Sequence, residues 1–139
     1  MLYDCPVSLG EIVDKVTILE IKLANISDPL RRSHVTKELD LLIASFSSIL
    51  LKYEHEKTLL LDINSKLWSV EDELRELEKI GNFDDRFVQL ARSVYHLNDQ
   101  RASIKYQINI SSESYIVEQK SYSSYTSRTL ETQIDGRAP

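Results

Sequence analysis

The apolar residues between Val35 and Leu77 recur in steps of four and three residues without a slip, and Glu56 is the only polar member of the series. This spacing is typical of a coiled-coil seam. No Gly or Pro interrupts the chain between Pro29 and Gly81. The pattern therefore predicts one helix of about 50 residues, roughly 75 Å long, against which the other elements pack. The seam consists of Val35, Leu39, Leu42, Phe46, Ile49, Tyr53, Glu56, Leu60, Ile63, Leu67, Val70, Leu74 and Leu77.

A shorter amphipathic helix is predicted before the long one. Ser8 followed by Glu11 has the spacing of a capping box, which starts a helix. Apolar residues then repeat at three and four residues as far as Ile26. Asp28 and Pro29 stop this helix and supply the N-cap and first residue of the next one. The connection is so short that the first helix must fold back on the long helix.

A third helix is predicted after the turn at Gly81 and Asn82, which favour the left-handed conformation that ends helices. It runs from about Arg86 to about Ile110, with Arg101 as the polar member of its stripe. The short turn makes it antiparallel to the second half of the long helix. The predicted fold is all-α, with antiparallel helical hairpins around one long central coiled-coil helix.

The periodicity disappears after Ser111, and a tail rich in Ser, Thr and Tyr follows. We divide the chain into a helical domain, residues 1–120, and a C-terminal tail, residues 121–139. Residues 115–117 form either a short strand or a docked extended piece. The remainder of the tail has the composition of segments that do not fold alone.

Composition narrows the classes of function. The net charge is -5, which opposes a phosphate backbone, so we expect no nucleic-acid partner. Cys5 is the single cysteine, which favours a reducing compartment. The first ten residues lack the basic region and long apolar run of a signal peptide. We expect a soluble, cytoplasmic protein that does not enter a membrane.

In the predicted antiparallel arrangement, the first helix begins and the third helix ends opposite the middle of the long helix. Polar side chains converge there, and this junction is the predicted site for a small molecule. The alternative is that Glu56 and Arg101 only set the register of an oligomeric seam. The candidate residues are Glu11, Asp14, Lys15, Tyr53, His55, Glu56, Arg101 and Lys105.

No metal or cofactor site is predicted. His34, His55 and His96 lie far apart, and the residue pair His55–Glu56 lacks the second His of a zinc-protease helix. Neither an activated nucleophile nor a glycine-rich phosphate loop is present in the sequence. Small helical chorismate mutases resemble this chain in helix order. They line their interior with several Arg and Lys, whereas here only Arg101 falls on a seam position.

A homodimer is predicted from surface area, and a further protein partner is allowed for. A long hairpin leaves much of its apolar stripe in water, and covering about 1,000 Å² of it gives about 25 kcal/mol before association costs. Two long helices would lie antiparallel about a twofold axis near Tyr53. The alternative is a break of the long helix at residues 62–65, giving four shorter helices in one chain.

Several motifs together resemble a family of small bacterial proteins of unknown function. The resemblance implies a link to cell-surface glycan biosynthesis, because such proteins are often encoded beside or fused to genes for that process. It implies no activity and no catalytic residue. The motifs are SLGEIVDKVTILEIKLANISDP from Ser8, LWSVEDELRELE from Leu67, FDDRFVQLARSVYHLNDQRASIKYQIN from Phe83 and VEQKSY from Val117.

The function predicted from these observations is a non-enzymatic interaction or assembly module with a link to glycan biosynthesis. The competing hypothesis is a small-molecule binder or a chorismate-mutase-like enzyme that uses the polar junction. A filled apolar seam at the junction favours the first hypothesis. A deep polar pocket there favours the second.

Overall fold

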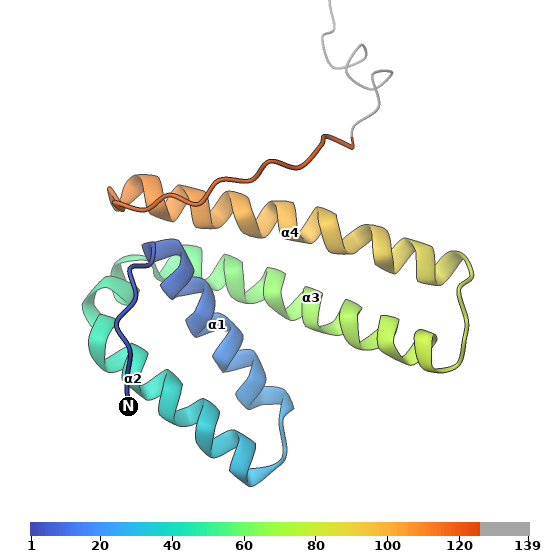
Figure 1. The fold of residues 1–139 in the computed structure, drawn as a ribbon, viewed down its shortest axis with the longest axis horizontal. Coiled ribbons are helices and arrows are strands. Elements are labelled where there is room, and N and C mark those ends of the chain that lie inside the picture. The colour runs from blue at the N-terminus through green and yellow to red at the C-terminus, as the bar shows by residue number, and fades with distance from the viewer. Residues whose placement is uncertain (126–139) are drawn as a thin grey trace, which may run out of the picture.

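A computed structural model describes residues 1–125, and this part of the chain is all-α, as predicted. Its helices form two antiparallel hairpins, α1 with α2 and α3 with α4 (Figure 1). Helix α1 contacts each of the other three helices, whereas α2 scarcely touches α3. The first helix, rather than a long central one, is therefore the element that joins the fold. The helices are α1 (Leu9–Asn25), α2 (Pro29–Lys52), α3 (Glu54–Lys79) and α4 (Asp85–Ser111).

The predicted helix ends are confirmed by their capping contacts. Ser8 Oγ accepts from the backbone N–H of Glu11 at 3.3 Å, which caps α1. Asp28 Oδ1 accepts from the N–H of Arg31 at 2.8 Å and caps α2. Gly81 follows α3 with φ +67°, a value that residues with a Cβ avoid. These helix ends could be predicted because each depends on only a few adjacent residues.

The prediction of one continuous helix from Pro29 to Gly81 is wrong. The chain leaves helical geometry at Tyr53, with φ -109° and ψ 29°, and α2 is also kinked at Phe46. The alternative of four shorter helices is confirmed, but its predicted break at residues 62–65 is misplaced, because these residues lie inside α3 and the break is at Tyr53. Backbone hydrogen bonding continues through the break, from the Tyr53 N–H to Ile49 at 3.2 Å and from the Lys57 N–H to Tyr53 at 2.9 Å. Leaving the helical path at Tyr53 therefore costs few hydrogen bonds.

Packing on α1 explains the break. Val13 and Val16 of α1 are completely buried, and Leu19 is nearly so, in one cluster with Tyr53 and Leu60. Each fully buried Val or Leu side chain contributes about 1.5–3 kcal/mol. A straight 75 Å helix would leave part of this stripe in water. The turn at Tyr53 lets α2 and α3 each cover α1, and that gain outweighs an irregular residue.

The break also changes the predicted oligomer and seam. Glu56 lies half-buried in the first turn of α3, just after the break, instead of midway along a continuous seam. The twofold arrangement predicted for the homodimer assumed two unbroken helices of roughly 75 Å, which the chain does not have. The homodimer itself stays a prediction.

After α4 the chain reverses and runs back along that helix in an extended conformation (Figure 1). We call residues 114–125 the strap. It contains no strand, so residues 115–117 are a docked extended piece rather than a sheet element. Ser114 Oγ accepts from the N–H of Leu9 at 3.4 Å, which ties the start of the strap to α1. The predicted boundary at residue 120 stays a prediction, and residues 126–139 of the predicted tail lie outside the described residues.

Within residues 1–125, no helix combines the length and the apolar character needed to cross a membrane.

Candidate functional site

A close approach of α1 to α4 positions the polar residues of both helices. The N–H of Gly10 donates to Asn109 Oδ1 at 2.7 Å. A Cβ at Gly10 would lie 2.6 Å from the backbone carbonyl oxygen of Lys105, closer than real Cβ atoms come. Glycine at this position therefore lets the first turn of α1 lie directly on the last turns of α4.

Asp14 of α1 is completely buried, and its carboxylate accepts hydrogen bonds from two side chains, those of Arg101 and Asn64. The Arg101 guanidinium donates from Nε to Oδ1 at 2.8 Å and from Nη2 to Oδ2 at 2.5 Å. Asn64 Nδ2 donates to the same Oδ1 at 2.9 Å and to Thr17 Oγ1 at 2.9 Å. Two-point Arg–carboxylate pairs are stronger and more directional than single ion pairs. Asp14 therefore joins α1, α3 and α4 through one carboxylate.

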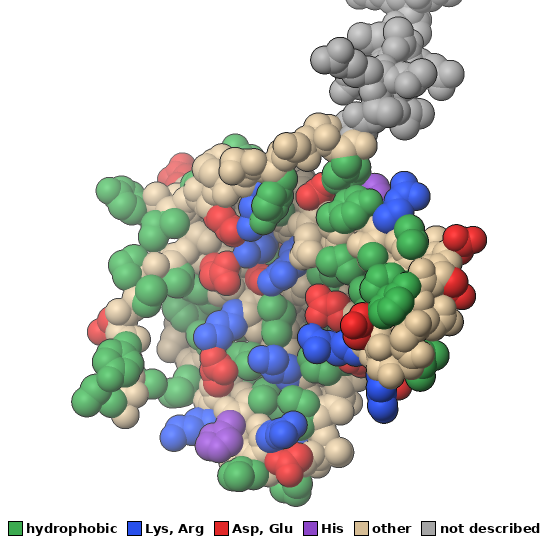
Figure 2. Space-filling model, turned by 45° about the vertical axis from the view of Figure 1, so that its right-hand side comes forward, with side chains coloured by type: hydrophobic (Ala, Val, Ile, Leu, Met, Phe, Trp, Pro, Cys, Tyr) green, Lys and Arg blue, Asp and Glu red, His purple; other side chains and the backbone are tan. Residues whose placement is uncertain are grey.

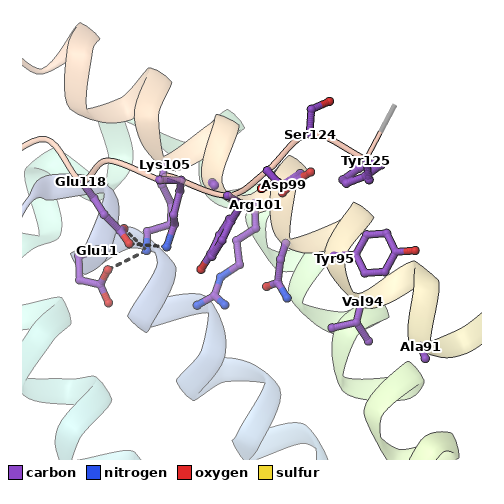
Figure 3. A pocket seen from close by; sticks show the side chains of 15 residues that line it. Glu11, Ala91, Val94, Tyr95, Asp99, Arg101, Lys105, Glu118, Ser124 and Tyr125 are labelled. Atoms are coloured by element: carbon purple, nitrogen blue, oxygen red, sulfur yellow. Dashed lines mark hydrogen bonds and ion pairs between the residues drawn. The ribbon is translucent and has the colours of Figure 1, made fainter. Parts of the chain in front are cut away.

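Lys105 is the second charged centre, and its side chain is only 10% exposed. Its Nζ lies 2.7 Å from Glu11 Oε2, 3.2 Å from Glu118 Oε2 of the strap and 3.9 Å from Asp14 Oδ2 (Figure 3). Burial alone would lower the pKa of Lys105, but the hydrogen bond to Glu11 and the charge of Asp14 outweigh burial and raise the pKa. Lys105 is thus a charged link between α1, α4 and the strap.

The pKa values of the neighbouring groups move in the directions that these contacts dictate. The hydrogen bond to Asp14 raises the pKa of Arg101. Hydrogen bonds from Lys120 and then from Lys105 lower the pKa of Glu118. Both cations and Glu118 are therefore charged at neutral pH.

The structure brings together four of the eight candidate residues of the polar junction, namely Glu11, Asp14, Arg101 and Lys105. It places the other four elsewhere. Lys15 pairs with Glu38 of α2 at 2.6 Å on the surface. Tyr53 is a core residue whose hydroxyl accepts a hydrogen bond from Ser111 at 3.4 Å. His55 is exposed and Glu56 is half-buried at the start of α3.

Sequence reasoning missed Asn64, Thr17 and Glu118. Asn64 is 5% exposed between the buried residues Ile63 and Leu67, so a polar residue inside an apolar stripe was the available signal. Glu118 belongs to the strap, which has no periodicity from which its docking could be predicted. Its partner Lys105 is on a helix that was predicted, but the contact depends on the reversal of the chain after Ser111.

A groove of about 1,070 Å³ lies beside the charged cluster, between α4 and the strap. We call it the strap groove. Figure 3 shows Glu11, Lys105 and Glu118 at one end and Tyr95, Val94 and Ala91 at the other. Its volume is slightly above the range of about 300–1,000 Å³ that is ordinary for small-molecule pockets. Its lining residues are Glu11, Ala91, Val94, Tyr95, Asn98, Asp99, Arg101, Ala102, Lys105, Glu118, Lys120, Tyr122, Ser123, Ser124 and Tyr125.

Aromatic residues close the end of the strap groove that is away from Lys105. The rings of Tyr95 and Tyr125 lie 5.1 Å apart, and His96 is within 5.0 Å of Tyr95 and 4.7 Å of Tyr125, between ring centroids. A hydrogen bond between Tyr125 and Asp99 raises the pKa of the Tyr125 hydroxyl. These contacts fix the far end of the strap against α4.

Residues 4–132, nearly the whole chain, match a family of unknown function (DUF6165). The chain belongs to DUF6165. No curated protein and no solved structure gives a significant match.

In this DUF6165 chain the strap groove is lined by charged and aromatic side chains together. Residues 1–125 contain no cluster of three or more His, Cys, Asp or Glu side chains suited to a metal ion. On the face shown in Figure 2, Lys and Arg side chains are interspersed with Asp and Glu, with no large area of one sign. The groove offers hydrogen-bonding groups and aromatic faces, both of which can hold a ligand.

Proposed function

We propose that this protein is a non-enzymatic module that binds a polar small molecule in the strap groove. The supporting observation is the groove itself, which places Arg101, Lys105 and Lys120 among carboxylates and tyrosines in a space of about 1,070 Å³. A polar pocket of several residues beside the charged cluster is the feature that favours small-molecule binding over a filled apolar seam.

The state of the charged groups favours binding over catalysis. A general acid or base works best with a pKa near the working pH. Arg101 and Lys105 both have pKa values raised further above neutrality by their carboxylate partners. A chorismate-mutase-like reaction would need several unpaired cations for a dicarboxylate. Here Arg101 is bound at two points by the buried Asp14.

The proposal also names the biological process and the compartment in which the protein acts. The resemblance noted in the sequence links the chain to bacterial proteins encoded beside glycan-biosynthesis genes, and we propose that the module serves that process in the cytoplasm. The exposed, free Cys5 is compatible with a reducing compartment.

A thermal-shift screen against polar metabolites tests the proposal, because a ligand that binds only the folded chain raises its melting temperature. Tyr122 lines the strap groove and is 78% exposed, so we expect Tyr122→Ala to keep the fold and lose the shift. Tyr115→Ala is the matched control, since Tyr115 lies on the same strap, is fully exposed and does not line the groove. A screen without any stabilising molecule, or equal shifts in both variants, contradicts the proposal.

Assembly is a second candidate function, supported by the turn between α3 and α4. Ile80, Phe83 and Val88 are 71%, 55% and 49% exposed there, at the end of the hairpin away from α1 (Figure 1). Exposed apolar residues in one region are typical of contact surfaces. We propose that this hairpin end pairs with a second copy of the chain.

Sedimentation equilibrium at micromolar concentration tests this assembly. We expect twice the chain mass for the wild type and the single chain mass for Phe83→Ser. The control Leu41→Ser changes a residue that is 44% exposed on α2 and should leave the dimer intact. A wild-type chain that sediments as a monomer rules out the homodimer.

A further inference from the structure

The strap groove is long as well as large. Its lining on α4 extends from Ala91 to Lys105, which corresponds to about 21 Å along a helix. Its opposite wall is the strap from Lys120 to Tyr125. A site of this length and volume suits an elongated ligand better than a single compact metabolite.

The lining charges balance. Three cations, Arg101, Lys105 and Lys120, face three carboxylates, Glu11, Asp99 and Glu118. Each cation already has an anionic partner, and the strap supplies one of these pairs itself, Lys120 with Glu118 at 2.5 Å. The groove therefore presents neither a net positive nor a net negative field to a ligand.

An anionic ligand would have to displace an internal carboxylate. Arg101 would have to give up Asp14, whose side chain is completely buried and cannot move into water. Lys105 would have to give up Glu11 or Glu118, at 2.7 and 3.2 Å. Each exchange replaces one charge pair by another and yields little net binding energy.

A cationic ligand meets the corresponding difficulty at Glu11 and Glu118, which Lys105 already engages. Asp99 is engaged by a hydrogen bond from the neutral Tyr125 hydroxyl, so it can accept a further hydrogen bond without an ion pair being broken. A neutral hydroxyl can use the remaining hydrogen-bonding capacity of the paired groups and adds no charge to the balanced set. A carboxylate has about four acceptor sites, an ammonium three donors and a guanidinium five. A hydroxyl both donates and accepts, so it can bond to either sign of charge without breaking a pair.

The aromatic residues supply the second part of the recognition. Tyr95, Tyr122 and Tyr125 line the strap groove. Tyr95 and Tyr125 contact each other and His96, whereas Tyr122 is 78% exposed and offers the most open ring to a ligand. Flat aromatic faces pack well against rings that carry C–H groups on one side and hydroxyls at the edge. Asn98 and Ser123 add uncharged hydrogen-bonding groups.

From this combination we infer that the ligand of the strap groove is an uncharged, hydroxyl-rich chain of linked rings, which is the chemistry of a neutral oligosaccharide. The inference rests on the proposed function and deepens it by naming the ligand class. It assigns stacking to Tyr122 and hydroxyl recognition to Asp99, both on the open surface of the groove.

The test uses the full chain on an array of short oligosaccharides of glucose, galactose, mannose and N-acetylglucosamine, together with acidic and phosphorylated counterparts. We expect binding to neutral members. Affinity for them should fall about tenfold or more in Tyr122→Ala, which loses a stacking face, and in Asp99→Asn, which loses charge-assisted hydrogen bonds. Tyr115→Ala should bind as the wild type does, since it lies outside the groove lining.

The outcomes separate this inference from the proposed function. Binding restricted to acidic or phosphorylated members overturns the neutral class. Stabilisation by another polar metabolite, with no oligosaccharide bound, overturns the ligand class and keeps the binding module. Absence of any ligand in both the array and the thermal-shift screen overturns both. Equal loss of oligosaccharide binding in Tyr115→Ala and Tyr122→Ala also overturns the assignment to the groove.

Discussion

Both oxygens of the buried Asp14 carboxylate are held by a single guanidinium, that of Arg101, which lies 87 residues later in the chain. The pair joins the first helix to the last. It also fixes Arg101 at the floor of the strap groove, so the stability of the fold and the geometry of the groove depend on the same contact.

Removing the acid should strongly destabilise the fold. Asp14→Ala leaves Arg101 without its carboxylate and Asn64 with only its bond to Thr17, and breaking a buried pair costs about 3–5 kcal/mol. The Arg101 side chain is 27% exposed and can be partly solvated, so we expect a loss near the lower limit. Urea denaturation measures this loss in the free energy of unfolding.

Lys15→Ala is the control, because its surface pair with Glu38 should contribute less than about 1 kcal/mol. Equal losses in the two variants would show that Asp14 is not a structural centre.

Gly10→Ala should destabilise the chain by steric overlap. The added Cβ would meet the Lys105 carbonyl oxygen at 2.6 Å and Asn109 Oδ1 at 2.9 Å, so α1 must shift away from α4. Overpacking of this kind costs about 1–3 kcal/mol. Because the nearer contact is backbone, Asn109→Ala should not rescue the variant. Thermal melts of the single and double variants decide this.

Gly81→Ala should also destabilise the chain, but for a different physical reason from Gly10→Ala. No atom lies within 4 Å of its added Cβ, but its φ of +67° is unfavourable for any residue with a Cβ. We expect a loss of about 1–2 kcal/mol, from backbone conformation alone. Gly81→Asn should recover part of it, since Asn tolerates the left-handed region. A Gly81→Ala chain as stable as the wild type would contradict this account of the turn.

The helix ends could be predicted from the sequence because each depends on a few adjacent residues. Ser8, Asp28 and Gly81 act through their own side chains or their own φ. The break at Tyr53 has no such signal, since Tyr53 continues the heptad series and no Gly or Pro is near. It arises because α1 contacts both α2 and α3, which is a long-range property.

The candidate site, like the fold, could be predicted only in part from the sequence. Glu11, Asp14, Arg101 and Lys105 could be placed together because they lie where two predicted helices end against one another. The contribution of the strap could not be predicted, since an extended segment without periodicity carries no sign of where it docks. Two of the six charged lining residues, Glu118 and Lys120, and one wall of the groove belong to the strap and therefore became apparent only in the structure.

The strap should loosen at acidic pH. Lys120 of the strap and then Lys105 of α4 lower the pKa of Glu118 below its ordinary 4.5, and the part due to Lys105 favours the docked strap above that value. The contribution is lost as the pH falls through the lowered pKa of the docked state. Amide NMR shifts of residues 116–120 should therefore titrate with a midpoint below 4.5. In Glu118→Gln this titration should be absent, whereas Glu113→Gln should keep it. A midpoint above 4.5 in the wild type would contradict the docking contact.

The break at Tyr53 predicts a distance that a straight helix cannot give. Arg31 and Glu78 are exposed near the outer ends of α2 and α3, and in one continuous helix they would be about 70 Å apart. Spin labels on Arg31→Cys and Glu78→Cys, in a Cys5→Ser background, should report a much shorter distance, because α2 and α3 both turn onto α1.

Tyr53→Leu should keep the short distance, since α1 packing rather than the tyrosine itself maintains the bend. Leu19→Asp, which places a charge in the buried contact, should lengthen or broaden the distribution. A single distance near 70 Å in the wild-type background would restore the continuous helix, and with it the rod-like homodimer.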